Sequence, residues 1–253
     1  MKIRIAKKIA ESGITSRRDA ERLIESGAVS VNGEKIDTPV FFVDDDDTIC
    51  VNGKAIPQKS SQIHLWKFYK PRNVIVSRFD PQGRQTVFDV IPHLPERLLY
   101  VGRLDYNSEG LLLFTNDGNF SRKLELPKNG LKRIYRARII GNLRDETVKN
   151  LKQNGLELKE NGAKIKYNIV DIQKDEKKSK ISGANSWLTI TLAEGKNREI
   201  RKIMEHYSCQ VSRLIRIEYG GIKLDSMQPG EFKKCRQDEI KRLWKSISDF
   251  KIL

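Results

Sequence analysis

The sequence predicts an α+β protein with a small N-terminal module and a larger second domain. Apolar residues recur at helical spacing over residues 3–10, and a Ser-x-x-Asp pattern from Ser16 opens a second helix. Two Asn-Gly pairs, at 32–33 and 52–53, follow short alternating segments, as expected for β-hairpins. Alternating apolar residues farther along the chain predict the strands of a second sheet. This periodicity supports the α+β class and nothing finer.

Length and net charge set the outer bounds. The chain has 253 residues, enough for one sizeable core and an appended module, and its net charge is +15. The charge is uneven, because the first sixty residues hold ten basic and ten acidic side chains. The remaining residues therefore carry the whole surplus, with 38 basic against 23 acidic side chains. Such a surplus indicates a polyanionic partner without identifying it.

The three cysteines and three histidines are scattered along the chain. They form no C-x-x-C and no H-E-x-x-H motif, which argues against a disulfide framework and a structural metal site. No apolar run approaches the ~18 residues that a membrane span needs. We therefore expect no metal, no membrane association and a reducing cytoplasm as the compartment.

The first sixty residues predict two helices followed by a small sheet. The first helix ends before Gly13, and Ser16 with Asp19 caps the second, which ends before Gly27. The segment TSRRDAERLIESGAVSVNGE resembles the S4 RNA-binding module, which would cover residues 1–58. The resemblance implies that one basic helical face contacts RNA phosphates, with a solvated helix pair as the alternative. The bases on this face are Arg4, Lys7, Lys8, Arg17, Arg18 and Arg22.

An acidic run and then a polar segment follow this module. Asp44–Asp47 would repel RNA, so we expect this run to face away from it. The polar, proline-containing segment lacks periodicity, and we place the linker at residues 59–62. The second domain then covers residues 63–253. It contains a turn at Pro81–Arg84, whose base Arg84 is either an RNA contact or plain surface.

The stretch at 100–118, YVGRLDYNSEGLLLFTNDG, places a polar loop between two apolar runs. The runs predict short buried strands, Asn116–Gly118 predicts a tight turn with positive φ, and residues 119–126 predict a short helix after it. In the loop, the carboxylate of Asp105 lies two residues from Arg103 and three from Ser108. The simple alternative is a hairpin loop with a structural aspartate, because aspartate is common in loops.

A basic segment near residue 200, EGKNREIRKIMEHY, predicts a helix capped by Asn197. Three bases lie beside or opposite the apolar stripe of this helix, namely Arg198, Arg201 and Lys202. They lie at the helix start, where the macrodipole disfavours cations. They indicate a bound anion, and a solvated basic face is the alternative. The stripe that we expect to be buried is Ile200, Ile203, Met204 and Tyr207.

The segment GRLDYNSEGLLLFTNDG resembles the catalytic motif of the RNA pseudouridine synthases. The similarity is to the branch with the ribosomal small-subunit enzyme and its large-subunit relatives of the B, E and F types. Four further segments match family motifs in order, namely KPRNVIVSRFDPQGRQTVFDVIP, RIYRARI, EGKNREIRKI and VSRLIRIEYG. The resemblance covers most of residues 62–235. It implies a mixed, mainly antiparallel sheet with helices beside it and an active cleft across the sheet face.

The resemblance implies a role for each of five residues. Asp105 is the catalytic nucleophile, and Arg201 pairs with it and keeps it ionised. Tyr135 lies against the target uracil, Leu214 closes the pocket, and Arg103 fills the space that the extruded base leaves. The expected RNA contacts outside the module are Arg84, Arg198 and Lys202.

The implied reaction converts a specific uridine of ribosomal RNA to pseudouridine, and 23S RNA is favoured because the motifs read like those of the B-type enzymes. No atom enters or leaves, so no cofactor is expected, and the requirements are a flipped-out base, a carboxylate and a dry pocket. The expected substrate is an RNA hairpin or a pre-ribosomal particle, and the expected enzyme is a monomer. The alternatives are a 16S uridine, a non-catalytic ribosome-assembly factor, and a glycosidase, which requires paired acids.

Overall fold

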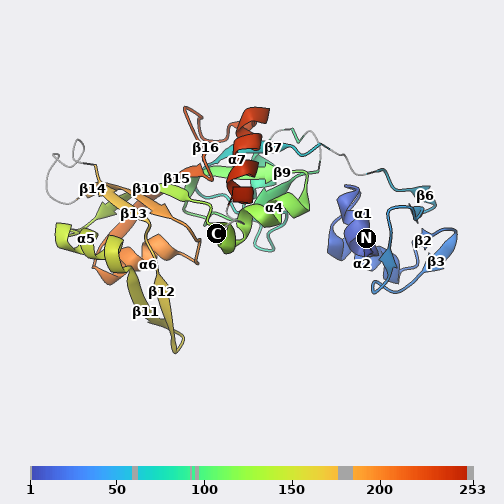
Figure 1. Cartoon of the computed structure of the whole chain (residues 1–253), viewed down its shortest axis with the longest axis horizontal. Helices are drawn as coiled ribbons and strands as arrows, with labels where there is room; N and C mark the ends of the chain where they lie inside the picture. Colours follow the sequence, from blue (N-terminus) through green and yellow to red (C-terminus); the bar gives the residue numbers. More distant parts are fainter. Residues whose placement is uncertain (1, 59–61, 92, 95–96, 176–184, 250–253) are drawn as a thin grey trace. The chain divides into compact units, whose positions relative to one another are not determined.

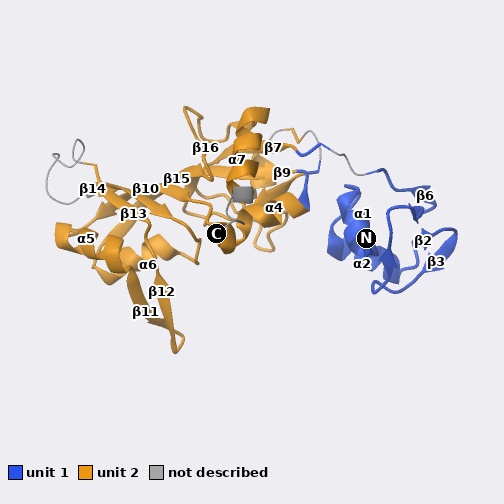
Figure 2. Ribbon diagram, in the orientation of Figure 1, with its two compact units in different colours: residues 1–63, 95–97, 116–118 blue, residues 64–94, 98–115, 119–253 orange. Residues whose placement is uncertain are grey.

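The computed structural model describes residues 2–58, 62–91, 93–94, 97–175 and 185–249. The chain divides into two compact units, which Figure 2 colours separately. The first unit is Met1–Ile63 with Pro95–Arg97 and Asn116–Gly118, and the second is the remainder. Residues 59–61 of the expected linker lie outside the described part of the chain.

The first unit combines two helices with a small antiparallel sheet (Figure 1). The sheet has the order β3-β2-β5-β6, and β1 pairs separately with β4. One apolar core joins helices and sheet, because Ile5 and Ile24 are as buried as Val29. The elements are α1 (Ile5–Glu11), α2 (Arg17–Glu25), β1 (Ile3–Arg4), β2 (Val29–Val31), β3 (Glu34–Ile36), β4 (Phe42–Val43), β5 (Ile49–Val51) and β6 (Lys54–Ala55).

Local sequence signals account for most of this unit. The Ser16 Oγ accepts a hydrogen bond from the Asp19 N–H at 3.1 Å, which confirms the predicted cap. Asn32 and Asn52 adopt φ angles of 52° and 50° at the two predicted hairpins. Ile3 differs from the expectation, because it belongs to a short strand and the helix begins two residues later.

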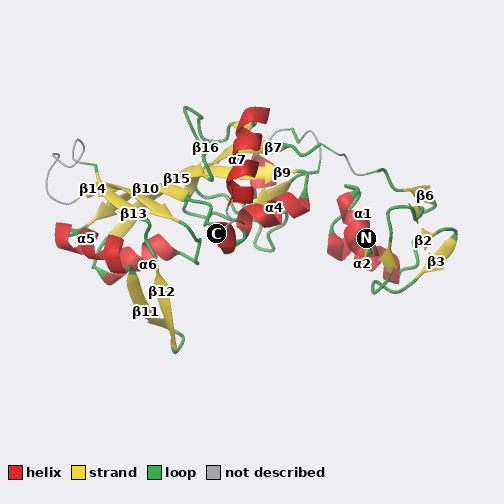
Figure 3. Cartoon of the chain, in the orientation of Figure 1, coloured by secondary structure: helices red, strands yellow, loops and turns green. Residues whose placement is uncertain are grey.

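The second unit is built on a large sheet (Figure 3). Nine of the described strands join it, in the order β13-β14-β10-β15-β9-β7-β17, with β8 on β9 and β16 on β15. Among these strands only β9 and β15 pair in parallel, so the predicted α+β class with a mixed, mainly antiparallel sheet is confirmed. The strands are β7 (Leu65–Lys70), β8 (Leu99–Val101), β9 (Glu109–Thr115), β10 (Arg133–Ile140), β13 (Asp171–Lys174), β14 (Asn185–Leu192), β15 (Gln210–Tyr219), β16 (Ile222–Lys223) and β17 (Phe232–Lys234).

Helices lie beside this sheet, and a two-stranded hairpin extends away from it (Figure 1). Helix α6 packs on β15 and α5 on β13. These elements and the remaining ones are α3 (Val87–Val90), α4 (Gly118–Glu125), a 3-10 helix (Pro127–Asn129), α5 (Asp145–Asn154), the hairpin β11 (Leu156–Glu160) and β12 (Ala163–Tyr167), α6 (Glu199–His206) and α7 (Gln237–Asp249).

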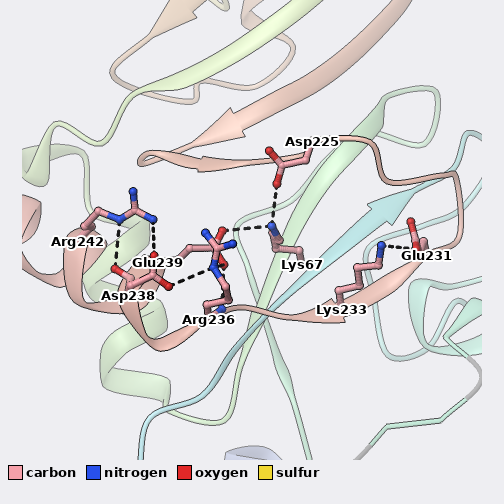
Figure 4. A network of polar contacts seen from close by, with 8 residues as sticks. All are labelled: Lys67, Asp225, Glu231, Lys233, Arg236, Asp238, Glu239 and Arg242. Atoms are coloured by element: carbon pink, nitrogen blue, oxygen red, sulfur yellow. Dashed lines mark hydrogen bonds and ion pairs between the residues drawn. The ribbon is translucent and has the colours of Figure 1, made fainter.

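A polar network fastens α7 to the sheet (Figure 4). The Lys67 Nζ of β7 lies 3.1 Å from Asp225 Oδ2 and 3.2 Å from Glu239 Oε1 in the first turn of α7. Desolvation alone would lower the pKa of Lys67, but the two carboxylates outweigh it and raise that pKa. The buried cation is therefore matched by its partners, and the C-terminal helix has a fixed attachment.

The parallel contact of β9 with β15 fixes where the loop at 102–108 lies. Gly110, at the start of β9, is opposite Arg216 in the middle of β15. A Cβ atom at Gly110 would lie 2.3 Å from the Arg216 carbonyl oxygen, so only glycine permits this approach. On the other edge of β15, Arg216 is opposite Tyr135 of β10. The register therefore brings the loop and Tyr135 to the same part of the sheet.

The helix expected after β9 forms as α4, but the tight turn with positive φ that was predicted before it does not. Helix α4 begins at Gly118, and no residue of Asn116–Gly118 has a positive φ. Phe120 and Leu124 are buried along one side of this helix. Burial of that apolar side stabilises helical geometry directly after the strand, so the glycine serves as a first helical residue.

Candidate active site

A cavity of about 560 Å³ opens in the second unit beside the loop at 102–108. Its lining also includes residues of β10 and β15 and the start of α6. Pockets that bind small molecules span about 300 to 1,000 Å³, so this volume leaves room for a nucleotide. The predicted site residues in its lining are Asp105, Tyr135, Leu214, Arg103 and Arg198.

Glycines at both ends let the loop turn around Asp105. Gly102 has a φ of 63° and Gly110 a φ of 100°. The Gly102 N–H donates to Glu125 Oε1 at 2.7 Å, and the Ser108 N–H donates to the Asp105 carbonyl oxygen at 3.0 Å. These bonds close the loop and leave the half-buried side chain of Asp105 at the cavity wall.

Lys70, at the end of β7, supports this loop from inside the protein. Its side chain is fully buried, and Nζ donates to the carbonyl oxygens of Ser108 at 2.8 Å, Pro71 at 2.9 Å and Tyr106 at 3.4 Å. Burial lowers the pKa of Lys70 to about 8, against the attraction of Asp105, which raises it. The sequence indicates this residue only as a lysine at the end of an apolar strand in the KPRN segment, so its role was not expected.

Arg201, on α6, supports the same loop from a different element than Lys70. Its Nη1 donates to the Val211 carbonyl oxygen at 2.9 Å and its Nη2 to the Asn107 carbonyl oxygen at 3.4 Å. The expected direct pair with Asp105 does not form, since no ion pair joins these two described residues and both guanidinium arms meet carbonyls. Burial lowers the pKa of Arg201, and Asp105 opposes that shift, so the carboxylate and the cation still attract each other.

Strands β10 and β15 deliver two further predicted residues to the cavity. Tyr135 and Leu214 are 8% and 6% exposed, and both line it. Leu214 is opposite Ala137, two residues from Tyr135 on the same strand face. Arg103, by contrast, is exposed at the opening. The cavity therefore brings the carboxylate of Asp105 together with the ring of Tyr135 and the apolar side chain of Leu214.

Two further buried polar side chains of the lining, Glu199 and Arg216, were not expected from the sequence. Glu199 is 3% exposed, its Oε2 accepts from the Lys196 N–H at 3.0 Å, and its Oε1 has no hydrogen-bond partner among the described residues. Burial raises the pKa of Glu199 to about 7. The Arg216 Nε donates to the Leu111 carbonyl oxygen at 2.7 Å, and its Nη2 likewise lacks a partner there. Their burial depends on tertiary packing, which a single sequence does not display.

Asn197 is not the cap of α6. The N-cap is Arg198, which has left-handed angles of φ 51° and ψ 30° and makes no side-chain cap. The carboxylate of Glu199 instead accepts from the Lys196 N–H and satisfies the backbone of this turn. The predicted apolar stripe is largely confirmed, because Ile200, Ile203 and Met204 are buried.

Most bases expected to contact RNA have acidic neighbours in the structure. The pairs are Lys7 with Glu11, Lys8 with Asp45, Arg22 with Asp19, Arg84 with Asp80, Arg198 with Glu205, and Lys202 with Glu160. The Lys8 contact places Asp45 of the acidic run against the basic face instead of away from it. Surface pairs of this kind are worth only about 0 to 1 kcal/mol, so a phosphate can replace the acid. Arg4, Arg17 and Arg18 are exposed, and no ion pair joins them to the described residues.

Comparisons with known proteins agree with this geometry. Residues 64–206 match the family model of RNA pseudouridylate synthase, and residues 3–49 match that of the S4 domain. A Rickettsia bellii protein named an uncharacterized RNA pseudouridine synthase is 44% identical over 245 residues, 96% of this chain and 99% of its own. The ribosomal large subunit pseudouridine synthase B of Bacillus subtilis is 36% identical over 241 residues, 95% of each chain. A solved pseudouridylate synthase has the same fold, with a TM-score of 0.62 at 23% identity over 95% of this chain and 99% of its own.

The fold and the cavity define an RNA-modifying isomerase with an RNA-binding S4 domain. The chain belongs to the RNA pseudouridine synthase family, and within it to the type that includes the ribosomal small-subunit enzyme and the B-type enzymes of the large subunit. No helix in the part of the chain that the structure describes is both long and apolar enough to cross a membrane.

Proposed function

We propose that the protein isomerises a specific uridine of ribosomal RNA, in the 23S molecule, with Asp105 as the nucleophile. The observation that carries this proposal is the position of Asp105 in a cavity with Tyr135, on a loop whose carbonyls bind the buried cations Lys70 and Arg201. The 23S target rests on the relatives whose names specify the large ribosomal subunit.

The reaction exchanges one glycosidic bond for another. Asp105 attacks the flipped-out nucleotide, the N1–C1' bond breaks, and the detached uracil turns in the cavity. A bond then forms between C5 and C1', and the bond that Asp105 made to the nucleotide breaks and frees the carboxylate. C5 loses its proton and N1 ends protonated. Atoms and electrons balance within the nucleotide, so the chemistry requires no cofactor. The dry cavity holds the free uracil until the new bond forms.

The other cavity residues hold the base. Tyr135 stacks on the uracil, an interaction worth ~1 to 3 kcal/mol that offsets part of the cost of unstacking. Leu214 closes the pocket, and Arg103, exposed at the opening, fills the space that the base leaves in the RNA. Arg201 and Lys70 keep the loop of Asp105 in place and supply positive charge near its carboxylate.

The RNA contacts extend beyond the cavity. Arg84, Arg198 and Lys202 in the second unit and the basic face of the S4 domain bind phosphates of a hairpin or a pre-ribosomal particle. The enzyme acts as a monomer in the cytoplasm. The basic surplus of the second domain gives it attraction for RNA irrespective of sequence.

Mapping pseudouridines in ribosomal RNA tests the proposal. RNA from a strain lacking the protein should lose a 23S pseudouridine that returns with the wild-type gene and not with Asp105→Asn. Loss of a 16S pseudouridine would correct the target, and restoration by Asp105→Asn would refute the nucleophile. An unchanged map with altered ribosome assembly would refute the enzymatic function on ribosomal RNA.

A further inference from the structure

Two adjacent residues at 78–79 reverse the usual placement of charged and apolar side chains. The Arg78 guanidinium lies over the ring of Phe88 at 4.5 Å, and its Nη2 donates to the Leu98 carbonyl oxygen. Partial desolvation lowers the pKa of Arg78. Phe79, next to it, is 75% exposed, more than any other large apolar side chain among the described residues. The guanidinium of Arg78 therefore stacks on the ring of Phe88, whereas the ring of Phe79 is exposed to solvent.

Hydrogen bonds of side chains and backbone hold the loop that carries Phe79. The Ser77 Oγ donates to the Phe79 carbonyl oxygen at 2.6 Å and accepts from its N–H at 3.3 Å. Asp80 then accepts from the N–H and the guanidinium of Arg84, which closes the turn. A bridge between Ile75 and Thr86 joins the two ends of the loop. The exposed ring therefore sits on a held backbone, which lowers the entropy lost when it binds a partner.

This loop adjoins the loop of the proposed nucleophile. Ile75 and Val76, at its base, line the same cavity as Asp105. The Asn73 N–H donates to the carbonyl oxygen of Tyr106, the residue after Asp105, at 2.9 Å. Tyr106 is 40% exposed and lines the cavity. Phe79 and Tyr106 thus belong to neighbouring loops beside the cavity.

We propose that Phe79 and Tyr106 stack on unpaired nucleotides that flank the target uridine. The proposal rests on the proposed function and narrows its substrate to a single-stranded or loop segment of RNA. Exposed aromatic rings next to basic side chains are the usual platform for unpaired bases, because every base has a face to stack. Arg103 and Arg198 are exposed and line the same cavity, and their charge matches a phosphate chain better than an apolar protein surface.

The test compares full-length variants in binding to a short oligouridylate and to a blunt RNA duplex of equal length. Phe79→Ala and Tyr106→Ala should each weaken oligouridylate binding roughly five- to hundredfold, the equivalent of one stacked base, and leave duplex binding unchanged. Phe79→Trp should retain the affinity, and Phe79→Leu should lose it, because leucine keeps apolar area but has no ring. Ile140→Ala, at an exposed apolar position of the same unit, is the matched control.

Three results would overturn the stacking role. These are unchanged oligouridylate binding by Phe79→Ala, full affinity of Phe79→Leu, or a loss of self-association in Phe79→Ala with RNA binding intact. Pseudouridine formation by the wild type on ribosomal RNA is measured in parallel. Its absence contradicts the proposed function, whereas wild-type activity with unaltered Phe79→Ala binding contradicts the stacking role alone.

Discussion

The carbonyls of Tyr106, Asn107 and Ser108, directly after Asp105, are held by the buried cations Lys70 and Arg201. The cations reach the loop from different elements, β7 and α6, so its position depends on both. Each also feels the charge of Asp105. The carboxylate is thus oriented through its backbone, without a direct salt bridge.

Replacing Arg201 tests this support. Arg201→Met removes the donors to Val211 and Asn107 and a positive charge near Asp105. A displacement of ~1 Å can cost roughly a hundredfold in rate, so kcat should fall by about that factor with little change in KM. The exposed Arg198→Met variant should do the reverse and raise KM. A normal kcat for Arg201→Met under saturating RNA would show that the reaction does not depend on this support of the loop.

Glu199 makes the stability depend on pH. Its pKa is raised to about 7 by burial, against about 4.3 for an unperturbed glutamate, so the folded state binds more protons between these values. Stability therefore falls as pH rises through that window. Glu199→Gln should be more stable than the wild type by up to about 3 kcal/mol near pH 8, an advantage that is lost near pH 4. Thermal unfolding at both pH values measures this, with Glu205→Gln as the exposed control. If Glu199→Gln were more stable than the wild type by the same amount at both pH values, the raised pKa of Glu199 would be contradicted.

The sequence predicted those residues of the candidate site that belong to recognisable family motifs. Asp105 and Tyr135 were assigned from GRLD and RIYR, and the structure places both in one cavity. Lys70 and Glu199 also lie within motif segments, but nothing in the spacing predicts that a charged side chain will be buried. The contact of Arg201 with carbonyls instead of Asp105 is likewise a consequence of tertiary packing.

At the scale of elements, the parallel junction of β9 and β15 positions the loop at 102–108, which carries the proposed nucleophile. It is a short contact of two residue pairs in a sheet whose other strands pair antiparallel. The strand register around it aligns the start of β9 with the middle of β15 and hence with β10. Most of this sheet joins segments distant in sequence, so alternation predicts its strands but not their neighbours.

Gly110 tests the importance of this junction. Gly110→Ala introduces a Cβ 2.3 Å from the Arg216 carbonyl oxygen at a φ of +100°. We expect a loss of stability of at least ~2 kcal/mol, from the left-handed backbone and the clash together. Gly102→Ala is the control, because its φ is +63° and no heavy atom lies within 4 Å of the new Cβ, so only about 1 kcal/mol is lost. Equal melting temperatures for the two variants would contradict the close approach.

Elements set by local signals were predicted well, and those set by packing were not. The Ser16 cap and both Asn-Gly hairpins appear where the sequence places them. Asn197 and Asn116 carried equally good local signals, yet neither has the expected role. At Asn197 the buried Glu199 satisfies the turn, and at Asn116 burial of α4 prevents a tight turn. Long-range contacts override local preference at both positions.

At the scale of the whole molecule, charge differs between the two parts of the chain. The first sixty residues are neutral overall, and their basic face is partly neutralised by its own acids. The second part carries the entire surplus. We therefore expect the general attraction for RNA to come from the second domain, with local phosphate contacts from the S4 domain.

The salt dependence of RNA binding separates these contributions. The double variant Arg17→Gln/Arg18→Gln should lower the slope of log affinity against log salt by about 1.4, which corresponds to two lost contacts to a single strand. Arg22→Gln should change it less, because Arg22 Nη1 already lies 3.2 Å from Asp19 Oδ1. An unchanged slope in the double variant would show that this face does not bind phosphate.

The most direct test of the central claim is pseudouridine formation by purified Asp105→Asn on ribosomal RNA, alongside the wild type. Asparagine has nearly the same shape but no nucleophilic carboxylate, so the account predicts no pseudouridine. RNA affinity should stay within a few fold of the wild type, since it comes mainly from phosphate contacts. Measurable pseudouridine from the variant, at wild-type affinity, would contradict the assignment of Asp105 as the nucleophile.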